Sequence, residues 1–297
     1  MHTGIRRTIQ SLLFLFISIH FLFAQGRLEF HGIIGMSNYQ GDLQPSTFTV
    51  ENARGAIGAN IRYGITEKFF ARGGIGVGEI YGNDKKNKPE LQVRNLDFKS
   101  KINDLYLGLE YRLLKPEVLG LTPYVFVGVG VFHFNPFTTY GDKNEKIFLQ
   151  PLGTEGQGLP EYPDREMYKL TQLSIPIAGG LLWHVNDHFM LGIEFRQNKT
   201  FTDYLDDVSN RYALEAPLLR DRGPIAVELA WRRDEYDGRP YPANEPKRGD
   251  PNFNDWYYHF GFSVGFTIPN GAGGAGWGMG GKAGKNRMKQ FGCPKWK

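Results

Sequence analysis

Eight segments in which apolar and polar residues alternate constrain the fold of this chain more than any other feature. Successive side chains of a β-strand point to opposite faces, so a period of two predicts strands with one apolar face. In the clearest segment, residues 54–65, Ala59, Ile61 and Tyr63 alternate with Asn60 and Arg62. The eight segments are residues 27–39, 54–65, 69–81, 103–113, 124–134, 173–185, 189–198 and 256–268.

The connections between these segments are alternately short and long. Residues 66–68, 114–123 and 186–188 form the short connections, and the long polar ones are 41–53, 82–102, 135–170 and 199–255. An even number of strands with this alternation is typical of outer-membrane barrels, with short periplasmic turns and long extracellular loops. A soluble sandwich would scatter its loop lengths. We therefore predict an all-β fold, a single eight-stranded antiparallel transmembrane β-barrel.

Composition and aromatic placement agree with this prediction. A mean hydropathy of −0.39 argues against a helical membrane protein, whereas alternating strands average to such a value. Most strand glycines among the 38 in the chain fall on the face away from lipid, where a narrow barrel has little room. Tyrosine and tryptophan prefer the membrane interface, although ordinary strand ends also carry them. The expected interfacial residues are Tyr63, Tyr111 and Trp183 near the short turns and Tyr39, Tyr81 and Trp256 near the long loops.

The two ends of the chain differ from the barrel region, residues 25–268. Arg6 and Arg7 precede an apolar run over 12–23 and a small residue, Ala24, which predicts a signal peptide over 1–24. An apolar run of about a dozen residues is short for a membrane anchor, which needs about 20. We therefore expect export to the cell outer membrane. Residues 269–297 form a glycine-rich tail with six Lys or Arg and no acid.

Eight charged side chains face the barrel interior by the same alternation. A charge in a dry interior needs a partner, so we expect an ion-pair network that fills the lumen. A selective conduit is the alternative. However, eight strands leave an interior filled by side chains, and Tyr106, Phe126 and Phe132 would obstruct it further. The network is expected to comprise Glu29, Arg62, Arg72, Asp104, Glu110, Arg112, Glu194 and Arg196.

The sequence does not predict an enzyme. Residues 261–265 read Gly-Phe-Ser-Val-Gly, but they lie inside an alternating segment rather than on the strand-to-helix turn that exposes a nucleophilic serine, and His-Glu-x-x-His does not occur. We therefore predict no enzyme activity and no cofactor. His31, His184 and His259 are expected to hydrogen-bond inside the lumen, and His188 to lie in a short turn.

Metal and disulfide chemistry are also disfavoured. One cysteine excludes an internal disulfide framework and any multi-cysteine metal site. Asp203, Asp206 and Asp207 could offer oxygen ligands to Ca²⁺, but their spacing lacks the calcium-loop pattern. Such clusters also cap turns, which is the interpretation we favour.

The tail suggests a tether with a docking end. Its glycines predict flexibility, and an even strand number would place it in the periplasm. A functionless end is equally compatible with the sequence. Cys293 is unpaired, so an intermolecular disulfide is an open alternative. The residues suited to partner docking are Lys285, Arg287, Lys289, Cys293 and Trp296.

Five blocks of sequence carry a resemblance to a known family. They are Ser37–Asp42, Arg94–Phe98, Thr122–Gly130, Thr200–Ser209 and Asn254–Tyr257. In these blocks the chain resembles the PorG-type outer-membrane barrels of the type IX secretion and gliding machinery, over nearly the whole length that follows the expected signal peptide. The resemblance implies a barrel that anchors or organises that complex by contacting periplasmic ring or lipoprotein subunits.

Three functional hypotheses follow. The first is a non-enzymatic barrel embedded in outer-membrane lipid, whose periplasmic surface includes the tail and the turns at Thr66, Lys115 and Asp187. The second is an adhesin-like barrel that binds through loops 135–170 and 199–255. The third is a small lipid enzyme. Nothing in the charge distribution indicates nucleic-acid binding.

Overall fold

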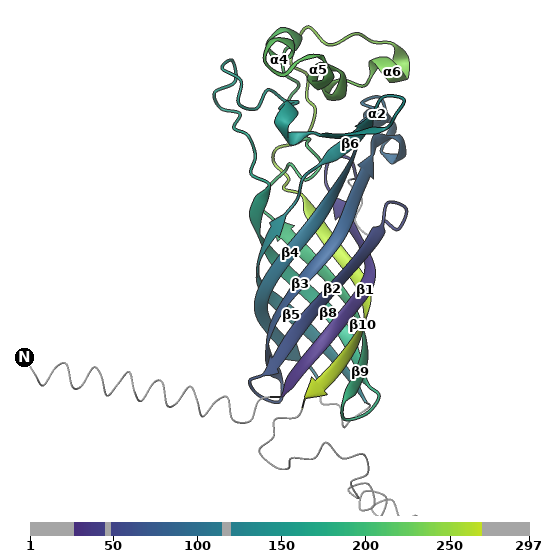
Figure 1. The fold of residues 1–297 in the computed structure, drawn as a ribbon, viewed down its shortest axis with the longest axis vertical. Coiled ribbons are helices and arrows are strands. Elements are labelled where there is room, and N and C mark those ends of the chain that lie inside the picture. The colour runs from purple at the N-terminus through teal and green to yellow at the C-terminus, as the bar shows by residue number, and fades with distance from the viewer. Residues whose placement is uncertain (1–26, 45–48, 115–119, 269–297) are drawn as a thin grey trace, which may run out of the picture. The chain divides into compact units, whose positions relative to one another are not determined.

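Eight long strands form a closed antiparallel barrel (Figure 1) in the computed structural model, which describes residues 27–44, 49–114 and 120–268. Neighbours in the chain are neighbours in the barrel, and β1 pairs with β10 from Leu28↔Ile268 to Gln40↔Trp256 to close it. The fold class is as predicted. The barrel strands are β1 Leu28–Gln40, β2 Arg54–Gly64, β3 Phe69–Asn83, β4 Asp97–Arg112, β5 Leu121–His133, β8 Thr171–His184, β9 Phe189–Thr200 and β10 Trp256–Ile268.

The outer wall of the barrel is apolar. The alternating residues predicted for one face are exposed on the outside, including Ile34 at 68%, Leu107 at 62% and Val129 at 67%. Such a continuous apolar surface far exceeds what a protein in water exposes, and it matches the band that contacts hydrocarbon in outer-membrane barrels. The structure therefore has the outer-membrane type of wall. In the described part of the chain, no helix has the length and apolar character needed to cross a membrane.

One of the six expected interfacial aromatics is misplaced. Tyr39 is fully buried, because it shares the inward parity of Glu29 and His31 on β1, and the prediction for it is wrong. Trp183 is 52% exposed near the short turns, and Tyr81 and Trp256 are half-buried near the long loops.

Strands β3 and β4 extend into the segment that was expected to be a long loop. The ladder between β3 and β4 continues to Asn83↔Asp97, so residues 82–83 and 97–102 of the expected loop 82–102 are strand. The alternation of apolar residues ends earlier because the outward positions of this extension, such as Lys99 and Lys101, are polar. These strands rise past the apolar band, where outward side chains face water.

The long loops fold into a cap at one end of the barrel (Figure 1). A short hairpin continues the sheet, with β6 Phe137–Tyr140 paired to β4 at Lys99↔Phe137 and to β7 Glu145–Phe148. The sequence prediction contained none of this structure. The remaining elements of the cap are the helices α2 Pro89–Gln92, α4 Glu215–Arg222, α5 Pro224–Ala230 and α6 Asp234–Asp237 and the 3-10 turns η2 Asp84–Lys86 and η3 Gln150–Leu152.

Candidate functional site

The centre of the lumen holds two arginines and two glutamates that pair with one another. The guanidinium of Arg72 contacts both carboxylate oxygens of Glu194, with Nη1 2.6 Å from Oε2 and Nη2 2.7 Å from Oε1. Arg62 Nη1 lies 3.2 Å from Glu110 Oε1, and each arginine also contacts the other glutamate at 3.5–3.6 Å. All four side chains are buried. Two positive and two negative charges thus neutralise one another across β2, β3, β4 and β9.

A second group continues the network toward the short-turn end. Arg112 donates to both oxygens of Glu29, at 3.0 Å and 2.6 Å, and its Nε lies 3.2 Å from Glu110. Arg27 and His31, which were not predicted as network members, also contact Glu29, at 2.9 Å and 3.2 Å. Glu110 therefore joins this group to the central four.

Arg196 and Asp104 form the third group. Arg196 Nη2 lies 2.9 Å from Asp104 Oδ2, and His259 Nε2 lies 3.2 Å from the same oxygen. Tyr106 separates this group from the centre: its ring lies 4.2 Å from the Arg196 guanidinium carbon, and its hydroxyl accepts from Arg72 at 3.1 Å. The structure thus brings all eight expected residues into the lumen, in three groups.

Tyr124 is a member of the network that the sequence reasoning missed. Its hydroxyl donates to Glu194 at 2.5 Å, and Arg62 lies over its ring at 4.8 Å. Because Tyr124 faces inward by the alternation on β5, the sequence pattern could have indicated its place in the network.

A small cavity lies beside Glu194, Arg196 and His259. Its volume of about 30 Å³ has room for about one water.

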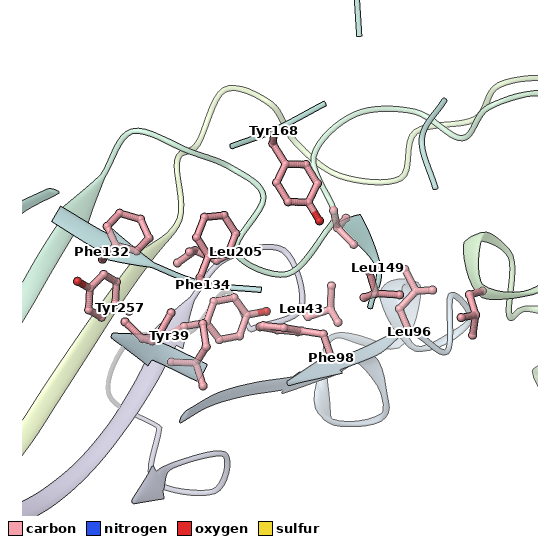
Figure 2. Close-up of a cluster of buried hydrophobic side chains, with 14 residues drawn as sticks. Tyr39, Leu43, Leu96, Phe98, Phe132, Phe134, Leu149, Tyr168, Leu205 and Tyr257 are labelled. Carbon is pink, nitrogen blue, oxygen red and sulfur yellow. The ribbon is translucent and has the colours of Figure 1, made fainter. Parts of the chain in front are cut away.

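A cluster of buried apolar side chains closes the loop end of the lumen (Figure 2). Tyr39 and Phe98 meet edge to face with centroids 4.8 Å apart, and Phe132 lies 5.3 Å from Tyr257. We call this set the mouth cluster: Tyr39, Leu43, Ile80, Leu96, Phe98, Ile102, Phe132, Phe134, Leu149, Tyr168, Leu205, Val208, Leu229 and Tyr257.

The blocks that carry the family resemblance meet at this mouth. Four of the five contribute members of the mouth cluster, from 37–42, 94–98, 200–209 and 254–257. Polar contacts join them as well: Asp206 accepts from the Tyr39 hydroxyl and from the Leu43 amide, both at 3.2 Å, and Asp255 accepts from the Leu205 amide at 2.8 Å. These blocks therefore hold the loops onto the barrel.

Four acidic side chains lie close to one another beneath the cap: Asp42, Asp203, Asp206 and Asp255, here called the buried-acid cluster. Burial raises the pKa of Asp203 to about 9. Burial, followed by the charge of Asp42, raises the pKa of Asp206 well above its usual range, and burial, followed by the charges of Asp206 and Asp203, does so for Asp255. Asp203 Oδ2 and Asp255 Oδ1 accept no hydrogen bond. Within residues 27–44, 49–114 and 120–268, no three Asp, Glu, His or Cys side chains converge as metal ligands.

The histidines have structural contacts in the described barrel. His31 and His259 contact Glu29 and Asp104 as above, and His184 lies 3.2 Å from the Thr122 hydroxyl. His188 occupies the exposed turn between β8 and β9, as expected.

Thr66 and Asp187 are exposed in the short turns at the end opposite the cap. Lys115, the tail residues Lys285, Arg287, Lys289, Cys293 and Trp296, and the expected signal peptide lie outside the described residues.

A first prediction concerns ion conduction. Because the ion-pair network and the mouth cluster fill successive parts of the lumen, the purified barrel in planar bilayers is expected to show no stable open channel. Single-channel recording at both polarities checks this, with a bacterial porin as the positive control. Long-lived ohmic conductance steps whose frequency rises with protein concentration would contradict the closed lumen.

Comparison with known proteins gives one family match. Residues 7–148 match the model of a domain of unknown function, DUF6089, which is a little under half of the chain. No curated protein matches the sequence.

Solved structures similar to this chain are outer-membrane proteins at low identity. Ail, the attachment invasion locus protein of Yersinia pestis, is 8% identical with a TM-score of 0.39, covering 82% of this chain and 99% of its own. Neisserial surface protein A is 8% identical with a TM-score of 0.40, covering 81% and 97%. OprG from Pseudomonas aeruginosa is 12% identical with a TM-score of 0.33, covering 82% and 94%.

Proposed function

We propose that this protein is a closed, non-enzymatic barrel of the outer membrane that anchors or organises a type IX secretion or gliding complex through periplasmic contacts. The observation that carries the proposal is the sealed lumen. A barrel filled by paired charges and closed by an apolar mouth is suited to hold a position in the membrane rather than to transport a solute. Four of the five blocks that resemble PorG-type barrels contribute to that mouth, and this resemblance supports the choice of complex.

The periplasmic contacts would use the end opposite the cap. The turns at Thr66 and Asp187 present exposed residues there, and the tail would add Lys285, Arg287, Lys289, Cys293 and Trp296. Tryptophan and arginine are enriched at binding interfaces, and the two lysines add positive charge that would favour an acidic partner surface. Export by the signal peptide over 1–24 is part of the same proposal.

The proposal predicts a secretion defect. A strain that lacks this protein is expected to retain type IX cargo in the periplasm, because the complex would lose a membrane anchor. Complementation with the full chain should restore secretion, whereas a chain that lacks residues 270–297 should restore less. Pull-down from solubilised membranes should recover a periplasmic lipoprotein with the intact chain, and non-reducing gels would reveal an adduct that depends on Cys293. Normal secretion by the deletion strain would refute the proposal.

The folded cap favours a second candidate, a barrel that binds a ligand at the cell surface. A cleft of about 450 Å³ lies between α2, Trp231 and residues 246–250, within the range of ligand sites. Protease shaving of the cap separates the two functions. Surface binding should be lost with the cap, whereas recovery of the periplasmic lipoprotein should persist.

A further inference from the structure

An apolar groove of about 960 Å³ crosses the outer wall of the barrel. Its outward-facing lining forms two adjacent rows that run from strand to strand. In the first row, each residue pairs with the next across the sheet: Phe30, Ile61, Gly73, Leu107 and Val129. The second row lies two residues further along each strand and comprises Gly32, Ala59, Ile75, Leu105, Val131 and Leu173.

Small residues hollow the wall at this place. Gly32 and Ala59 face each other in the second row, and Gly73 lies in the first. A Cβ added at Gly32 would meet no atom within 4 Å. Phe30 and Leu107, exposed at 39% and 62%, stand beside these positions. The groove is therefore a depression among large side chains.

The length of the groove matches a single lipid chain. The second row spans six strands, and five spacings of about 4.8 Å make about 24 Å. With strands tilted about 45°, such a row rises about 17 Å along the membrane normal. One leaflet of a hydrocarbon core of about 30 Å is about 15 Å thick. An extended acyl chain would thus follow most of the row.

The chemistry of the groove also indicates hydrocarbon. Its outward side chains are all apolar, and it lies within the band that faces the bilayer. Polar outward residues begin on the cap side of the second row, where Asn103 pairs with His133 and His133 pairs with Thr171. The ester or headgroup of a lipid could form hydrogen bonds at that edge, while its acyl chain follows the groove away from the cap.

We propose that this groove holds one acyl chain of an outer-membrane lipid in a fixed position. The site uses the wall of the barrel and is independent of the periplasmic and surface contacts considered above. A closely fitting chain gains dispersion contacts that a mobile neighbouring lipid lacks.

Filling the groove tests the proposal. The double variant Gly32→Leu/Gly73→Leu places side chains in the depression, and at Gly73 the added Cβ would lie 3.5 Å from Leu107, an ordinary contact. Native mass spectrometry of the detergent-solubilised full chain should show one phospholipid retained by the wild type. Retention should fall about tenfold in the variant, as expected when a few buried methylenes are displaced.

The matched control is Gly179→Leu, which adds the same side chain on β8 outside the groove, with its Cβ 3.9 Å from the nearest atom. This control should retain lipid like the wild type. Heat-modifiable electrophoretic mobility verifies folding, and Ala59→Leu serves as a second variant if the double variant does not fold. Equal retention by all folded variants would overturn the proposal. A cross-linked second copy or partner barrel that disappears in the variant would overturn it also, because the groove would then be a protein interface.

Discussion

Replacing Arg72 with methionine is expected to lower the free energy of unfolding of the barrel by about 3–5 kcal/mol. Arg72 is fully buried and contacts both oxygens of Glu194 and one of Glu110. Its removal leaves three buried charges, Arg62 with the two glutamates. The loss of stability arises mainly from leaving the Glu194 carboxylate buried without its partner, rather than from the loss of the attraction between Arg72 and Glu194.

The double variant Arg72→Met/Glu194→Gln should recover most of that loss. It restores neutrality because Arg62 and Glu110 remain paired at 3.2 Å. Urea unfolding of the barrel refolded into lipid vesicles measures all three proteins. Arg220→Met is the control, since Arg220 is exposed on α4 and its pairs with Glu161 and Asp221 are solvated; no measurable change is expected. A single variant as stable as the wild type would show that the network contributes little.

The cap is expected to lose stability as the pH rises from about 5 to 9. An acid whose pKa is raised by folding favours the folded state while it is protonated, and this contribution declines from the unfolded pKa, near 3.8, up to the folded one. Burial raises the pKa of Asp203 to about 9 and that of Asp207 to about 6. Asp206 and Asp255 shift in the same direction. Ionisation of these groups therefore works against the folded cap across this range.

Arg94 and Arg248 partly oppose this effect. Arg94 forms its ion pair with Asp84, but its charge also lowers the pKa of Asp42 and of Asp206. Arg248 lowers the pKa of Asp207. The pKa values of Asp42, Asp206 and Asp207 nevertheless remain raised.

Limited proteolysis of the cap over pH 5–9 measures this dependence. Asp255→Asn should make the cleavage rate less sensitive to pH, because the amide remains neutral and its oxygen can still accept from the Leu205 amide. Asp164→Asn, at an exposed position of the same cap, should leave the dependence unchanged. Cleavage that stays constant or slows with rising pH would contradict the prediction.

Much of the barrel could be predicted from local pattern. The period of two assigned Arg62, Arg72, Glu110 and Glu194 to the interior, since the face on which a strand residue lies depends only on its position along that strand. The same rule applied to β1 would have placed Tyr39 inside, but its position near a long loop suggested the membrane interface instead.

The cap could not be predicted in this way. Its helices are short, and its acids acquire shifted pKa values only because segments 42–43, 203–207 and 255 come together from different loops. Neither the β6–β7 hairpin nor the extension of β3 and β4 shows an apolar alternation, because these parts rise above the lipid-facing band.

By itself, the sequence determined the number of barrel strands, the inside and outside of each of them and the charges that fill the lumen, because alternation and loop length are local properties of a chain. Only the tertiary structure decided which charge pairs with which, since ion pairs join strands distant along the chain. It alone also produced the mouth cluster and the lipid-facing groove, because both arise from the register between neighbouring strands and from loops that meet over the barrel.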